Sequence, residues 1–96
     1  MILEVAMLNV KPGCSLAFEV AMKNARALIA ASDGFERMEL RSCVETADRY
    51  LLLVWWDCVE SHTEGFRKSK RYEKWRAILH DFYDPFPSVE HYGPPL

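Results

Sequence analysis

Apolar and polar residues alternate with a period of two in four parts of the chain, and each part predicts a β-strand. Residues 2–10 and residues 50–56 are apolar on both alternating sets, so each of these strands needs cover on both faces. Residues 35–43 alternate apolar with charged side chains, which is typical of a half-exposed strand. Residues 88–92 predict a short final strand. The two strands with two apolar faces indicate a sheet that is covered on both sides.

Two further segments carry apolar residues at the spacing of an α-helix. The first, residues 15–31, follows a Pro-Gly break and ends at a Ser-Asp-Gly turn. Its apolar stripe consists of Phe18, Met22, Ala25 and Ile29, widened by Val20 and Leu28. The second begins at Asp57, an N-cap with Glu60 at its third position, and runs to about residue 81. Interruptions near Gly65 and Ser69 predict two helical pieces, the second with a stripe of Tyr72, Trp75, Leu79 and Phe82.

The order β-α-β-β-α-β predicts one α+β domain over residues 1–96, of the ferredoxin-like kind with an antiparallel sheet and both helices on one face. The other face of that sheet is apolar and uncovered. Pairing with the sheet of a second copy would bury it, so the pattern predicts a homodimer. Trp55 and Trp56 point to opposite faces of one strand, so one is expected against the helices and the other against the dimer partner.

Composition narrows the classes of partner. Twelve Lys and Arg residues against 14 Asp and Glu residues leave a formal charge of −2, so no nucleic-acid partner is expected. The longest apolar run, residues 50–56, is too short to cross a bilayer, so no membrane partner and a cytoplasmic location are expected.

Cys14, Cys43 and Cys58 are an odd number at wide spacings, which favours reduced structural thiols over a disulfide scaffold or a zinc site.

Candidate chemistry is concentrated in the second half of the chain. Ten of the twelve aromatic residues and all three histidines lie between Tyr50 and Tyr92. A pocket built from this half would be a flat apolar slot with a few polar groups, which suits an aromatic ligand. Arg67 and Arg76 lie beside aromatic positions where they can receive an anionic or phenolate group, although a solvated helix face explains most of the basic residues around them.

The polar residues leave several interpretations open. His62 lies near the start of the long helical segment, where the helix dipole lowers the pKa of an imidazole and favours the neutral form that acts as a base. A surface or capping role is an equal alternative for His62, and structural roles are favoured for His80 and His91. Asn9 is either a structural hydrogen-bonding group or a ligand contact. No spacing of His, Cys or carboxylate residues favours a metal site.

Several motifs together resemble those of one family. They are Lys-Pro-Gly at residues 11–13, Ala-Ser-Asp-Gly at residues 31–34, Trp56, residues 62–67, Ser69, Tyr72, Trp75, Arg76 and residues 89–92. On these motifs the whole chain resembles the antibiotic biosynthesis monooxygenase family of the dimeric α/β-barrel superfamily. The resemblance implies a dimeric α/β barrel with a pocket between the sheet and the helices of each subunit. In the oxygenating members it also implies a reaction that needs no metal, flavin or haem.

The activity that the resemblance implies is a cofactor-independent, monooxygenase-like oxidation of a small aromatic quinol or anthrone-type substrate by O2. The deprotonated substrate supplies the electrons, so the protein orients it, takes a proton and shelters the intermediates. The residues that this assigns to substrate binding are Trp56, Phe66, Arg67, Tyr72 and Trp75. The catalytic candidates are His62 or His80 for the proton, and Arg67 or Arg76 for the developing oxyanion.

Other activities on the same fold remain as alternatives. A non-catalytic, dimeric small-molecule-binding protein needs the same aromatic slot but no titrating base. Isomerase or lyase chemistry would form product without consuming O2. Haem degradation is not expected, because Arg76 and Ala6 occupy the positions at which haem-degrading relatives carry an axial histidine and an asparagine.

Overall fold

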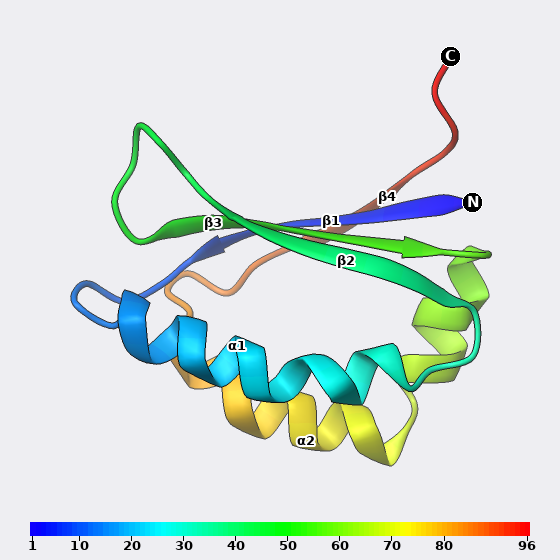
Figure 1. The fold of residues 1–96 in the computed structure, drawn as a ribbon, viewed down its shortest axis with the longest axis horizontal. Coiled ribbons are helices and arrows are strands. Elements are labelled where there is room, and N and C mark those ends of the chain that lie inside the picture. The colour runs from blue at the N-terminus through cyan, green and yellow to red at the C-terminus, as the bar shows by residue number, and fades with distance from the viewer.

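The computed structural model describes all 96 residues and has the predicted order of elements (Figure 1). The strands are β1 (Ile2–Asn9), β2 (Phe35–Ser42), β3 (Arg49–Trp56) and β4 (Val89–Tyr92). The helices are α1 (Ser15–Ala30), the π-helical segment η1 (Ser61–Phe66), α2 (Lys70–Leu79) and the single 3₁₀ turn η2 (His80–Phe82). The predicted second helical segment is therefore broken into two pieces, as expected, with the break at residues 67–69.

The four strands form one antiparallel sheet in the order β2-β3-β1-β4, and α1 and α2 lie side by side against one face of it (Figure 1). This is the ferredoxin-like α+β arrangement that the alternation predicts. The two central strands, β1 and β3, are the two that are apolar on both faces. The first strand pairs with the last, which places Glu4 opposite His91. This pairing brings residues from the two ends of the chain together within the sheet.

The core lies between the sheet and the two helices. The predicted stripe of α1 is confirmed, since Phe18, Met22, Ala25 and Ile29 are all buried. The expected widening of that stripe by Val20 is wrong, because this side chain points into solvent and is 61% exposed. Trp56 is fully buried under the helices, and Trp55 lies on the opposite face, where the Arg37 guanidinium stacks 4.0 Å from the centre of its ring.

The outer face of the sheet has no cover in the single chain. It presents apolar side chains of the two central strands, all partly or largely exposed: Leu3, Val5, Met7, Leu51, Leu53 and Trp55. Asn9 lies at the end of β1, where its Oδ1 accepts a hydrogen bond of 3.0 Å from Arg49 Nε on β3. This contact shows the structural role among the two that the sequence left open for Asn9.

Local hydrogen bonds fix the start and the break of the second helical segment. Asp57 Oδ1 accepts from the backbone N–H of Cys58 and from the Ser61 hydroxyl, so it holds the turn before η1 and does not form the predicted capping box with Glu60. Ser69 caps α2, since its Oγ accepts from Tyr72 N at 3.2 Å. Between Asp57 and Ser69, the segment η1 buries His62 and Phe66.

Candidate active site

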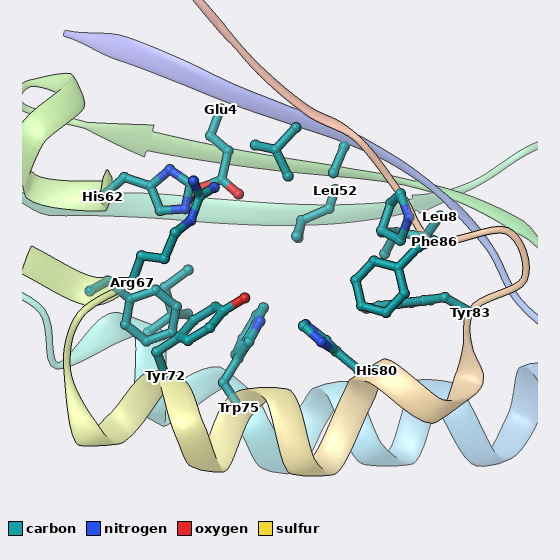
Figure 2. Close-up of a pocket in the computed structure, with 15 residues that line it drawn as sticks. Glu4, Leu8, Leu52, His62, Arg67, Tyr72, Trp75, His80, Tyr83 and Phe86 are labelled. Atoms are coloured by element: carbon teal, nitrogen blue, oxygen red, sulfur yellow. Dashed lines mark ion pairs between the residues drawn. The ribbon is translucent and has the colours of Figure 1, made fainter. Parts of the chain in front are cut away.

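A pocket of about 410 Å³ lies between the helix-facing side of the sheet and the second helical segment (Figure 2). Its floor comes from Glu4, Ala6 and Leu8 on β1, with Leu52 of β3 and Val89 of β4 beside them. Its opposite wall is aromatic and consists of Phe66, Tyr72 and Trp75, with the rings of Tyr72 and Trp75 each meeting Phe66 edge to face. The volume and the flat walls suit a small aromatic molecule.

One end of the pocket holds a buried carboxyl group and an imidazole, with a second imidazole behind it. The Glu4 side chain points inward from the middle of β1, and the residue is only 4% exposed. Its Oε1 accepts a hydrogen bond of 2.9 Å from the indole N–H of Trp56. His62 approaches the same carboxyl oxygen, with Nε2 3.4 Å from Glu4 Oε1, and its Nδ1 lies 2.8 Å from His91 Nε2. The ring of His62 also stacks on Trp56, so the whole group is held by neighbours from β1, β3, β4 and η1.

Burial sets the protonation of the carboxyl group. It raises the pKa of Glu4 to about 7, and the hydrogen bond from Trp56 and the positive charge of Arg67 oppose this rise only in part. A carboxyl group with a pKa near 7 exists in both forms at neutral pH. Glu4 can therefore accept a proton and return it.

His62 is neutral at the same pH. Burial first, and then the nearby charges of Arg67 and His91, lower its pKa to about 3. The neutral imidazole agrees with the sequence-based expectation, but its cause is burial and not the helix dipole. The contact between His62 and Glu4 is accordingly that of a neutral imidazole with a carboxyl group and not an ion pair at neutral pH.

Arg67 brings a positive charge to the same end of the pocket. It follows η1 directly, and its side chain reaches toward Glu4 and His62 at the pocket rim (Figure 2). The residue is exposed, so the guanidinium remains free to meet a ligand. An aryloxide bound along the aromatic wall would place its oxygen between this cation and the carboxyl group.

The other end of the pocket is formed by η2 and the segment that follows it. His80, Tyr83 and Phe86 surround this end, and the His80 ring packs edge to face on Phe86 at 4.8 Å (Figure 2). The buried Nδ1 of His80 has no hydrogen-bond partner. Burial, followed by the charge of Arg76, lowers the pKa of His80, while Asp81 opposes this effect.

Six of the eight predicted site residues line the pocket. They are His62, Phe66, Arg67, Tyr72, Trp75 and His80. Trp56 lies behind the wall, where it supports Glu4, and Arg76 is exposed on the outer side of α2 beside a neighbouring depression. The reason for the position of Arg76 is helical geometry, since the residue after an inward Trp75 is rotated by about 100°.

Sequence reasoning missed Glu4 and gave His91 only a structural role. The signal for Glu4 was present, because it is the one charged residue among the helix-facing positions of an apolar strand, with Ala6 and Leu8 next to it. A buried carboxylate in a sheet needs a specific reason. No group of three or more His, Cys, Asp or Glu side chains is close enough together to hold a metal ion. No helix is long and apolar enough to span a membrane.

Together the fold and the site define a class: a ferredoxin-like domain with an aromatic pocket that carries an acid–base group at one end. The model of the family described as antibiotic biosynthesis monooxygenase matches residues 1–78. The chain belongs to this family. It is also 47% identical over 92 residues to the uncharacterized protein YczJ of Bacillus subtilis, a match that covers 96% of this chain and 97% of that protein.

Solved structures share the fold. A crystal structure of a protein from Bordetella bronchiseptica that carries the same family name superposes with a TM-score of 0.94 at 32% identity, covering 99% of this chain and 97% of that one. SnoaB from Streptomyces nogalater, described as a cofactor-independent oxygenase, superposes with a TM-score of 0.78 at 16% identity, covering 99% and 93%. The likeness to SnoaB is one of fold alone.

Proposed function

We propose that this protein is a cofactor-independent, monooxygenase-like enzyme that oxidises a small aromatic quinol or anthrone-type substrate with O2. The observation that carries the proposal is a carboxyl group with a pKa of about 7 at the end of an aromatic pocket. Membership of the antibiotic biosynthesis monooxygenase family supports the same reaction class. The fold that the chain shares with a cofactor-independent oxygenase is compatible with it.

The proposed reaction converts substrate and O2 into a carbonyl product and water. The substrate binds along Phe66, Tyr72 and Trp75 and loses a proton to the Glu4 end of the pocket, which leaves an electron-rich aryloxide or carbanion. This anion passes an electron to O2, and the two radicals combine to form a C–O bond to a peroxide, which takes up a proton. Loss of the second hydrogen from that carbon, with cleavage of the O–O bond, forms the carbonyl group and releases water. The protein supplies orientation, proton transfer and a pocket that limits access of water.

Arg67 and His80 are assigned to the two ends of the substrate. The Arg67 guanidinium stabilises the negative charge that develops on the substrate oxygen. His80, which lines the other end of the pocket, binds a second polar group of the substrate. Arg76 lies outside this pocket, so its predicted part in stabilising the oxyanion is assigned to Arg67.

Oxygen uptake by the purified protein tests this proposal. A panel of reduced naphthoquinols and anthrones is compared in an oxygen electrode, with autoxidation subtracted. Arg67→Met is expected to lower kcat/KM by about 10-fold or more, because it removes the cation beside the developing oxyanion. Lys68→Met is the matched control, since Lys68 is the adjacent cation but is ion-paired with Glu64 on the surface. Ligand binding without uptake would indicate the non-catalytic binding protein instead.

We also propose that the protein works as a homodimer in the cytoplasm. The uncovered face of the sheet supports the dimer, because Met7 and Leu51 remain exposed there beside Leu53 and Trp55. Face-to-face packing of two such sheets buries these side chains. The three cysteines are free thiols, which suits a reducing compartment.

A further inference from the structure

Glu4 is buried, although a group that accepts protons repeatedly must exchange them with solvent. Its carboxyl group lies at one end of the pocket, and the residue is 4% exposed. A substrate lying along the aromatic wall would cover the side of Glu4 that faces the pocket. Proton exchange during a reaction would then need a route that does not cross the substrate.

His62 and His91 supply such a route. His62 has one ring nitrogen toward the carboxyl group, at 3.4 Å, and the other toward His91 Nε2, at 2.8 Å. His91 is only partly buried, on the edge strand β4, so the chain of three groups runs from the pocket to the surface. The pairing of Glu4 with His91 across β1 and β4 fixes the two ends of this chain relative to each other.

The Glu4–His62 contact and the His62–His91 contact each hold one proton. The protonation of Glu4 therefore determines the tautomers of both rings. When Glu4 is ionised, His62 donates Nε2–H to it and His91 donates Nε2–H to His62 Nδ1. When Glu4 is protonated, it donates to His62 Nε2, and His62 donates Nδ1–H to His91. The 2.8 Å between the two rings is a hydrogen-bond distance in either arrangement, whereas the 3.4 Å between His62 Nε2 and Glu4 Oε1 must shorten for the proton to pass.

We propose that Glu4 is the catalytic residue that accepts the substrate proton, and that His62 and His91 carry protons between Glu4 and solvent. That this proton comes from a bound substrate rests on the proposed function. In the discharging direction the Glu4 O–H bond breaks as His62 gains Nε2–H. The His62 Nδ1–H bond breaks as His91 gains Nε2–H, and His91 releases its Nδ1 proton to water or a buffer base. One proton has then left, Glu4 is a carboxylate, and both rings are neutral.

The surrounding charges favour this transfer. Arg67, at the end of η1, faces Glu4 and both histidines and stabilises the carboxylate, while the indole of Trp56 on β3 holds it by a hydrogen bond. From α2 and η2 the titratable groups across the pocket are Tyr72 and His80, and α1 contributes only the apolar Ile29. Because burial lowers the pKa of His62 to about 3, the proton passes through His62 without a stable imidazolium ion.

Oxygen uptake with added buffer base separates a proton path from a structural role. Glu4→Gln is expected to lower kcat by about 100-fold or more and not to respond to added imidazole. His91→Gln, which can keep a hydrogen bond to His62, is expected to lower kcat several-fold with KM unchanged, and added imidazole is expected to restore it. Glu90→Gln, an exposed neighbour on β4, is the control with unchanged kcat. Full activity of Glu4→Gln, or no rescue of His91→Gln, would overturn the proposal.

Nitrogen-15 NMR of the histidine rings tests the path without any substrate. In the native protein His62 and His91 are expected to change tautomer together in one transition between pH 5 and 9, centred near the Glu4 pKa of about 7. In Glu4→Gln that transition disappears. If the two rings change tautomer at different pH values, the path is rejected, whether or not the protein consumes O2. A joint transition without oxygen uptake on any substrate would reject the proposed function and support the path.

Discussion

Glu4 shows how the energetic cost of burying one carboxyl group becomes a chemical property. Removal from water penalises the charged form, and this effect is larger than the opposing hydrogen bond from Trp56 and the charge of Arg67. The folded protein therefore prefers the protonated acid up to about pH 7, whereas the unfolded chain ionises near the usual value of 4.5. The same difference that poises Glu4 for proton transfer makes stability depend on pH.

The sign of that dependence can be measured. Between pH 4.5 and 7 the folded state binds the Glu4 proton and the unfolded state does not, so the free energy of unfolding falls as pH rises through this window. The loss corresponds to about 3 kcal/mol when complete. Glu4→Gln removes this contribution, so urea unfolding at several pH values is expected to show the native protein losing about 3 kcal/mol relative to the variant from pH 4 to 8. Parallel curves would contradict the buried, protonated carboxyl group.

Glu4 also marks the limit of what a pattern of residues could predict about the site. The clustering of aromatic residues between Tyr50 and Tyr92 predicted a flat aromatic slot, and Phe66, Tyr72 and Trp75, which are close together in the chain, form one wall of the pocket. The partners of Glu4 come from β3, η1 and β4, far away in the chain. Their contact depends on strand register and on the break before α2, which local spacing does not encode.

At the scale of elements, the turn between α1 and β2 controls the start of η1. Gly34 has a positive φ of 82°, and its carbonyl oxygen accepts from the Asp57 N–H at 2.8 Å. A Cβ atom there would clash with Asp57 Oδ1 and Ser61 Oγ, the two groups that form the turn before His62. The predicted elements came from periodicity, turn residues and a predicted cap, but this contact between two turns needed the folded arrangement.

Gly34→Ala tests that contact, with Gly13→Ala as its matched control. Both glycines have φ near +80°, but nothing lies within 4 Å of a Cβ at Gly13. Gly13→Ala is expected to lower the free energy of unfolding by about 1 kcal/mol, the cost of the left-handed backbone, and Gly34→Ala by about 2–3 kcal/mol. Denaturant unfolding gives both values. Equal losses would show that the turn relaxes around the added methyl group.

At the scale of the whole molecule, the sheet has one face in the core and one without cover. The alternation in β1 and β3 predicted this division, and the structure shows helices on only one side. An exposed apolar sheet face is typical of an interface. At the centre of the uncovered face lies Leu53 of β3, which is paired with Val5 on β1.

Sedimentation velocity at micromolar concentration checks the proposed dimer. The native protein is expected to sediment at twice the mass of the 11.2 kDa chain. Leu53→Glu should shift it to the monomer, because two charges would be buried between the sheets. Leu16→Glu, at an 81% exposed position on α1, should leave the dimer intact. A native protein that is monomeric, or a dimer that survives Leu53→Glu, would place any association elsewhere.

The three tryptophans occupy three separate environments, and this gives the molecule its own optical probes. Trp75 lies in the pocket wall, Trp55 on the uncovered sheet face, and Trp56 stacks on His62 with ring centres 5.3 Å apart. Protonated imidazole quenches indole fluorescence, whereas the neutral ring does so weakly. With two of the three replaced by phenylalanine, the emission of the remaining indole follows ligand occupancy, subunit association or, near the His62 pKa of about 3, the protonation of His62. Each event thus has a separate spectroscopic signal within a single small domain.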